Sequence, residues 1–407
     1  MKVFLKLVLV ILIFISTQAS YAETLSLKLD EVISLALKEN PELKFERLKS
    51  EVGEAGIIIS KAYPNPSLTT NSNLADNTYE ILGVSQPLEF GYKKHFRVQV
   101  AKNELSLVNN AINQKNWDVR KRVIQLFTNL YISQKKLEAY QKMINNNEKL
   151  KNIAIKREKA GDITIIDVNQ ASVEYLKLQN LIDLEKAQML KVQKSLNYNL
   201  NLPIDTEIIA QELNILDTFN DNYLNQGLIE TAKSNSFELK EILLEKDLSS
   251  SKLKLAKANR IPSLTLSTGV AYAKENNRVS VFIGAGLEIP LFYRQKGEIE
   301  KEKANINIQE YKKLSLQKKI NADITSKVLE LKQLTSILLR NKKDIIPLQQ
   351  DIIEKTRIRY QIGRDPLIIS LQAQQEYLKF ILDNLETIEK YQQKIVELEY
   401  LVGKPVF

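Results

Sequence analysis

Side chains that could carry out catalysis or bind a metal are sparse in this sequence. His95 is the only histidine and cysteine is absent, which excludes thiol catalysis, disulfides and a cysteine-linked lipid anchor. A lone histidine makes neither a catalytic triad nor a metal site, so we expect His95 at an interface or a helix end. Trp117 falls inside a long helical pattern, where we expect packing. The sequence therefore predicts no enzyme activity, no cofactor and no metal ligands.

Charged residues cluster instead beside two glycines, Gly161 and Gly363. Glycine supplies the positive φ that lets a long helix end and the chain reverse. The neighbouring charges have two interpretations: they cap the next helix, or they form charged rings that narrow a pore. These neighbours are Asp162, Asp167, Arg364 and Asp365.

Internal similarity shows which elements position these turns. Short motifs recur in the same order about 200 residues later, such as the Pro-Ser-Leu of 66–68 at 262–264. We therefore divide the chain after residue 22 into a first repeat, 23–205, and a second repeat, 206–407. Each repeat predicts two helices, a β-hairpin, a very long helix, a glycine turn and a return helix. The long helices are expected at about 92–159 and 293–361, and the return helices at about 165–200 and 367–402.

The long helices need partners along their whole length. At 1.5 Å per residue the first would extend roughly 100 Å, which no small globule can bury. The return helix 367–402 carries an apolar seam with coiled-coil spacing from Leu378 to Val402, and further apolar residues off that seam. Contacts on two sides are typical of a wall of helices closed into a tube.

The two hairpins, about 67–90 and 263–292, alternate apolar with small or polar residues. This pattern is typical of membrane β-barrel strands, and equally of a soluble hairpin packed on one face. Aromatic residues at the hairpin ends would form an interfacial girdle. Four strands cannot close a barrel, so membrane strands would require oligomers, and three copies supply twelve. The girdle residues are Phe90, Tyr92, Phe292 and Tyr293.

Residues 1–22 have the basic start, apolar run and small residues of a secretory signal. Cleavage is expected after Ala22, with cleavage after Ala19 or an uncleaved end as alternatives. The 407 residues carry 58 Lys or Arg and 49 Asp or Glu, a net charge of +9. Lysine and glutamate alternate along helices rather than gathering with aromatics, so we expect solvated helix faces and no nucleic-acid partner.

Nearly all of the chain after the signal resembles the TolC-type outer-membrane efflux family. Singly each motif is weak, but their order, found twice, is specific. The segment 86–94 is similar to the CzcC-like cation-efflux branch. The family motifs are Asn-Pro-Glu-Leu at 40–43, Tyr-Pro-Asn-Pro-Ser-Leu at 63–68, Glu-Ile-Pro-Leu-Phe at 288–292, Arg-Tyr-Gln-Ile-Gly at 359–363 and Gln-Ala at 372–373.

The resemblance implies a mainly α fold with a small membrane β-barrel portion. Long coiled-coil hairpins and four strands per chain would assemble as a homotrimer, with a 12-stranded barrel and an α-helical tunnel. The protein would lie in the bacterial outer membrane, in contact with its lipid, and extend into the periplasm. A periplasmic adaptor (membrane fusion) protein would dock at the turns, and an inner-membrane pump of the resistance-nodulation-division or ABC type would deliver the substrate. The docking residues would be Gly161, Asp162, Gly363, Arg364 and Asp365.

Only some of the gate residues of that family are present at the matching positions of this sequence. Its acidic residues lie six and nine positions after the second glycine, where this chain has Ile369 and Gln372. The sixth position after the first glycine is Asp167, and Tyr360 matches a family tyrosine that takes part in closing the gate. The candidate gate is therefore Asp167, Tyr360, Ile369 and Gln372, with an apolar constriction around Ile369.

The predicted function is the exit duct of a tripartite efflux or type I secretion system, a passive conduit. The alternative is a periplasmic coiled-coil adaptor or structural protein with soluble hairpins and no membrane barrel. That alternative explains the signal and the long helices, but not two sets of apolar-faced strands flanked by aromatics.

Overall fold

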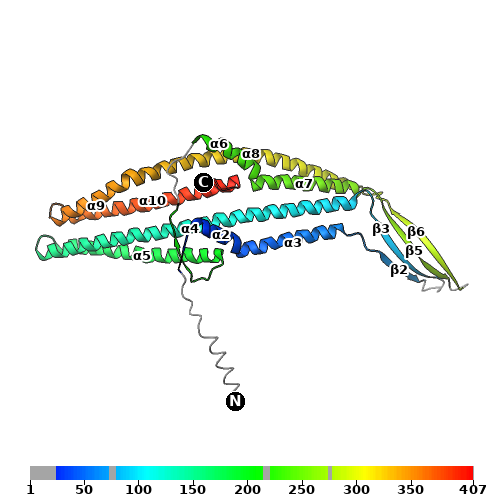
Figure 1. The fold of residues 1–407 in the computed structure, drawn as a ribbon, viewed down its shortest axis with the longest axis horizontal. Coiled ribbons are helices and arrows are strands. Elements are labelled where there is room, and N and C mark those ends of the chain that lie inside the picture. Colours follow the sequence, from blue (N-terminus) through cyan, green and yellow to red (C-terminus); the bar gives the residue numbers. More distant parts are fainter. Residues whose placement is uncertain (1–23, 73–78, 214–220, 274–276, 407) are drawn as a thin grey trace, which may run out of the picture. The chain divides into compact units, whose positions relative to one another are not determined.

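The computed structural model describes residues 24–72, 79–213, 221–273 and 277–406 (Figure 1). The chain forms two compact units, and each combines segments from both sequence repeats. One unit holds Met1–Pro41, Asn116–Leu228 and Ile324–Phe407; the other holds Glu42–Lys115 and Ile229–Asp323. The predicted signal, 1–22, lies outside the described residues, and the repeat boundary at 205 stays a prediction.

The second of these units contains a four-stranded antiparallel sheet and the helices attached to it. The strands are β2 (Ser67–Ser72), β3 (Tyr79–Leu88), β5 (Ser263–Ala273) and β6 (Arg278–Glu288), in the spatial order β2-β3-β5-β6. The helices are α3 (Pro41–Lys61), the start of α4 (Lys93–Lys159), α7 (Phe237–Ala258) and the start of α8 (Lys296–Arg340). Leu88 pairs with Leu264, and Ser263 with Glu288, so α4 and α8 leave the sheet at the same end, here called the sheet base.

The strand register gives this sheet one apolar face, as predicted, and an opposite face on which Ile81 and Phe282 lie among the predicted small and polar residues. Val281 pairs with Val270, and Val270 with Leu82, so the apolar positions of three strands align. Val281 is 76% exposed and Ile283 86% exposed, which identifies this face as uncovered within the chain. On the opposite face Phe282 lies across Gly269 and Gly83, where a Cβ on Gly269 would come 2.3 Å from the Leu82 carbonyl oxygen.

The other unit is helical. It contains α2 (Leu29–Glu39), most of α4, α5 (Ile165–Leu200), α9 (Ile346–Gln361) and α10 (Leu367–Val402); α6 (Asp221–Asn235) contributes its first half. Figure 1 shows α4 beside α5 and α9 beside α10 as two helical hairpins. Both return helices have the predicted bounds, because a glycine turn starts each one and a left-handed residue, Asn201 or Gly403, ends it.

The second long helix differs from the prediction of one uninterrupted helix over 293–361. It begins at Lys296, after a bend in which Gln295 has φ 56°. It is then divided by a π-helical turn, Asn341–Ile345, before α9. Pro347 explains the division, since it lacks an N–H and its ring would clash with the carbonyl four residues earlier. The wider turn moves that carbonyl aside and lets the helix continue.

A two-stranded parallel sheet was not predicted. β1 (Thr24–Leu27) pairs with β4 (Glu207–Ala210), with Thr24 opposite Glu207. Each strand lies just before the first helix of its repeat, so the pair joins equivalent points of the two repeats. Among the described helices, none combines the length and apolar character needed to cross a membrane.

Candidate functional sites at the helical turns and the sheet base

The two glycine turns have the same backbone geometry. Gly161 has φ +80° and Gly363 has φ +76°, as predicted for glycines that reverse a helix. The Asp162 N–H donates to the Arg157 carbonyl at 2.9 Å, and the Arg364 N–H donates to the Arg359 carbonyl at 2.9 Å. Each of these hydrogen bonds joins residues five positions apart, which is the bond that ends a helix in a Schellman motif.

Arg157 links the first hairpin to the second. Its Nη1 donates to the Tyr360 carbonyl at 2.9 Å, and its guanidinium lies 5.1 Å from the centre of the Tyr360 ring. Its Nε also lies 3.9 Å from Asp162 Oδ2, a loose ion pair. Sequence reasoning missed Arg157, because its partner is 203 residues away. Its one sequence signal was a basic residue in the last turn before a glycine.

Tyr360 lies in the hydrophobic core of these turns, packed with Leu150, Leu367 and Leu371. Burial raises the pKa of the Tyr360 phenol; the nearby Arg157 charge opposes this rise and Asp167 adds to it. The Tyr360 hydroxyl forms no hydrogen bond with any part of the chain that the structure describes. The same holds for Ser370 Oγ and for both amide atoms of Gln374, one turn further along α10. This end of the hairpins therefore buries polar atoms that the single chain does not satisfy.

The remaining candidate gate residues lie near these turns in different environments. Asp167 forms the capping box of α5: its Oδ2 accepts from the Thr164 N–H at 3.1 Å and from Thr164 Oγ1 at 3.0 Å. This confirms the capping interpretation for Asp167. Ile369 is 39% exposed and Gln372 is exposed, so both side chains are available to a neighbour or to a lumen.

Asp365 forms a clamp within the second turn. Arg359 Nε donates to its Oδ2 at 2.6 Å and Nη2 to its Oδ1 at 2.9 Å. The hydrogen bond from Arg359 lowers the pKa of Asp365, which keeps the carboxylate ionised. Asp162 and Arg364 remain exposed beside the two glycines. The predicted docking residues therefore form two exposed turns, of which the second is fixed by an ion pair.

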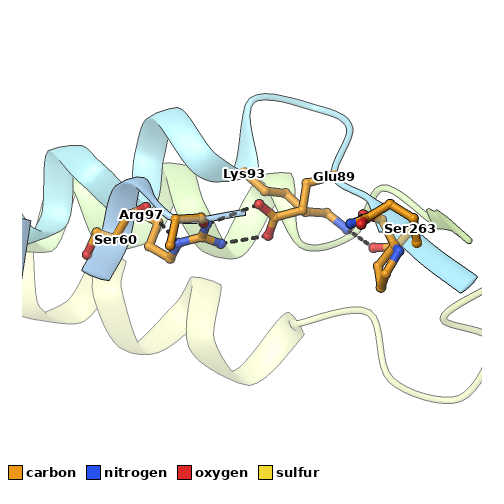
Figure 2. Close-up of polar contacts among 8 residues, drawn as sticks. Ser60, Glu89, Lys93, Arg97 and Ser263 are labelled. Atoms are coloured by element: carbon orange, nitrogen blue, oxygen red, sulfur yellow. Dashed lines mark hydrogen bonds and ion pairs between the residues drawn. The ribbon is translucent and has the colours of Figure 1, made fainter. Parts of the chain in front are cut away.

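At the sheet base, Arg97 fastens three elements together (Figure 2). Its Nε donates to the Ser60 carbonyl at 3.1 Å and its Nη2 to the Ala62 carbonyl at 2.9 Å, at the end of α3. Its Nη1 and Nη2 also bind Glu89 Oε1 and Oε2, at 2.6 and 3.1 Å, just after β3. A bidentate pair of this kind is geometrically specific.

Lys93 makes a second connection at the sheet base. It is 9% exposed, and its Nζ donates to Ser263 Oγ at 2.7 Å, which joins the start of α4 to the start of β5 (Figure 2). The predicted girdle surrounds these connections. All four aromatic side chains are exposed at the sheet base, from Phe90 at 46% to Phe292, which is fully exposed. Tyr293 also bonds Glu298 through its hydroxyl.

The geometry offers no catalytic constellation that we can identify in the described part of the chain. His95 lies edge-on to Phe96, with ring centres 5.4 Å apart, and is exposed. Trp117 stacks near Arg120, 5.4 Å away, inside α4. In the described segments no three His, Asp or Glu side chains are grouped to hold a metal ion. The polar groups described at the turns and at the sheet base hold structural elements together.

Residues 32–201 and 228–404 match the sequence model of a protein family described as "Outer membrane efflux protein". The chain belongs to this outer membrane efflux protein family. One matched segment falls within each of the two repeats that the sequence predicts. The family supports the efflux duct over the alternative of a periplasmic adaptor, and it places the protein in the outer membrane, extending into the periplasm.

Individual relatives agree with the family. The cobalt-zinc-cadmium resistance protein CzcC of Cupriavidus metallidurans is 22% identical over 387 residues, 93% of this chain and 90% of that protein. The CusC structure superposes with a TM-score of 0.76 at 16% identity, covering 92% of each chain. VceC of Vibrio cholerae gives 0.75 at 15% identity, covering 92% of this chain and 96% of that one.

These likenesses confirm the fold class and the resemblance to the CzcC-like branch. The protein is mainly α, with a small β portion, and it has the fold of outer-membrane efflux channels. Its function is that of an efflux duct.

Proposed function

We propose that three copies of this chain form a duct that passes substrate from a periplasmic adaptor and an inner-membrane pump to the outside. The observation that carries this proposal is the sheet. Among the described residues its apolar face is uncovered, and the edge strands β2 and β6 each have one unpaired side. In lipid those edges must be paired, and three four-stranded sheets joined edge to edge make a closed twelve-stranded barrel.

Detergent extraction with mass-calibrated sizing tests the assembly. A trimer that needs detergent, and that opens single channels in a planar bilayer, is the expected result. A monomer or dimer released by salt alone would contradict it.

The two glycine turns are the proposed adaptor-docking surface. Gly161 and Gly363 fix two adjacent exposed reversals, and apolar side chains surround them, with Ile166 64% exposed and Ile362 58% exposed. Exposed apolar residues beside a fixed backbone suit a protein partner. Replacing Gly363 by Val would strain the turn, since a β-branched residue is disfavoured at this φ. Cross-linking to the cognate adaptor should then fall, while trimer formation should persist.

The proposed gate is apolar and centres on Ile369. A carboxylate there would bring three negative charges into the constriction, so Ile369→Asp should raise single-channel conductance or cation preference. Ile368→Asp, its equally exposed neighbour on α10, is the matched control. Unchanged conductance and selectivity in Ile369→Asp would remove Ile369 from the gate.

We infer that the cargo is divalent metal cations. The support is the CzcC relative, whose name links it to cobalt, zinc and cadmium resistance. Cells that lack this chain should become more sensitive to those three ions and should keep their tolerance of hydrophobic drugs. The opposite pattern would assign the duct to drug export.

A further inference from the structure

Basic residues occur at every joint between the sheet base and its helices, and we call this group the base belt. It comes from both repeats and from all four joints between sheet and helices. Its members are Lys61, Lys94, Arg260, Arg294 and Lys296. The acidic residues closest in sequence to these joints are Glu89, Glu288 and Glu298, of which Glu89 is already paired with Arg97. The base belt is therefore an excess of positive charge.

The basic side chains of the sheet base differ in how many hydrogen bonds and ion pairs they make within the chain. Arg97 and Lys93 point into the joint, toward Glu89 and Ser263, and hold the elements together (Figure 2). Neither belongs to the base belt. Lys94 is held with its Nζ 3.5 Å from the centre of the exposed Tyr63 ring. This contact positions an ammonium beside an aromatic edge while leaving its hydrogen-bond donors free.

Arg260 and Arg294 carry the strongest argument. Both are exposed, and neither side chain bonds or pairs with any residue that the structure describes. The Arg260 N–H, in the turn after α7, donates to the Lys257 carbonyl at 3.3 Å, and Arg294 follows the exposed Phe292 and Tyr293. Two exposed guanidinium groups therefore belong to the segments that join the sheet base to α7 and α8.

The base belt continues directly from the apolar face of the sheet. Leu287, Ile289 and Leu291 are exposed along the chain that leads out of β6, and Phe292 is fully exposed before Arg294. An apolar band, then aromatic rings, then arginine is the order in which acyl chains, the interfacial region and phosphates follow one another across a membrane surface. Guanidinium groups bind phosphate oxygens in a bidentate manner.

We propose that the base belt binds the phosphodiester headgroups of anionic glycerophospholipids at the membrane boundary next to the helices. The proposal rests on the proposed barrel, because the sheet face must be in lipid. The belt sets the depth of the barrel: the apolar band fixes its height only loosely, whereas phosphate contacts fix it at one level. The charge excess makes anionic lipids preferred over zwitterionic ones.

Lipid retention by the detergent-solubilised full-length protein tests this proposal. The protein is mixed with dioleoylphosphatidylglycerol, dioleoylphosphatidylcholine or lipid A, and the lipids retained are counted by native mass spectrometry. We expect phosphatidylglycerol to be retained in preference. The double variant Arg260→Gln/Arg294→Gln should bind it roughly tenfold more weakly. The control Lys240→Gln/Lys318→Gln removes the same charge from exposed positions on α7 and α8 and should behave as the wild type.

Three outcomes would overturn the proposal: equal retention of the two lipids, equal retention by Arg260→Gln/Arg294→Gln and wild type, or stronger retention of lipid A than of phosphatidylglycerol. Single-channel recordings on the same samples separate this proposal from the barrel. Channels without a lipid preference would leave the duct intact and remove the belt, whereas the absence of channels and of a trimer would remove both.

Discussion

The sheet base and the helical turns differ in whether their polar groups have hydrogen-bond partners within the chain. At the sheet base Arg97 satisfies Glu89 and two helix-end carbonyls, and Lys93 is bonded to Ser263. At the turns the hydroxyls of Tyr360 and Ser370 and the amide of Gln374 are buried without a partner in the described chain. Satisfied networks specify one arrangement, and unsatisfied ones cost free energy that another arrangement can recover. The sheet base is therefore built as a fixed joint and the turns as a region that can change partners.

The largest expected effect tests the fixed joint. Arg97→Met leaves the Glu89 carboxylate, 15% exposed, without its partner and removes the donors to Ser60 and Ala62. The free energy of unfolding, measured by urea titration in detergent, should fall by roughly 3 kcal/mol. Lys252→Met, which breaks the exposed pair with Glu104, is the control and should cost less than about 1 kcal/mol. An equal loss of unfolding free energy in Arg97→Met and Lys252→Met would mean that the Arg97 contacts stabilise the protein no more than an exposed ion pair.

A smaller effect is expected from the polar contact that Arg157 makes between the two hairpins at the turns. Arg157→Gln removes the guanidinium from the Tyr360 ring and its bond to the Tyr360 carbonyl. Local opening should become easier by about 1.4 kcal/mol, so amide hydrogen exchange over 357–363 should accelerate about tenfold. Exchange in β3 and β5 should not change. Arg359→Gln, which breaks an exposed pair within one turn, should have a weaker effect.

Two hydroxyl deletions compare the regions directly. Ser263→Ala removes the only hydrogen-bond partner that the described chain gives Lys93 Nζ and should destabilise by about 1 kcal/mol. Tyr360→Phe removes a hydroxyl that has no partner in the described chain and should be neutral or slightly stabilising. Urea titration of both variants measures this. A cost for Tyr360→Phe as large as that for Ser263→Ala would show that the phenol is satisfied in the assembled protein.

Alkaline pH should give the smallest effect. Burial raises the pKa of the Tyr360 phenol above the value of about 10 that a tyrosine has in the unfolded chain. Below that value both states are protonated; above it the unfolded chain loses its proton first, so stability falls as pH rises toward the folded-state pKa. Tyr360→Phe should therefore flatten the loss of stability above pH 10. Tyr131 and Tyr140, whose pKa values burial also raises, remain in both proteins and provide the background slope.

Local signals predicted most of the fold. Glycine and proline mark the ends of α5, α10, α3 and the strands, and alternation predicted which face of each strand is apolar. The misses are not local. The four-residue strands β1 and β4 are too short for a pattern, and the π turn at 341–345 depends on how a proline is accommodated inside a helix. The contact of Arg157 with Tyr360 joins residues 203 positions apart in the sequence.

The parallel pair of β1 and β4 has a consequence for how the chain is made. Leu25 lies opposite Ile208, so the start of the first repeat is completed by a strand that belongs to the second. Because the chain is synthesised from its N-terminus, the β1–β4 pair cannot be complete until residue 210 has been made. β1 therefore has no β4 to pair with until more than half of the chain has been synthesised. Pairing of β1 is therefore a late step in the synthesis of this chain.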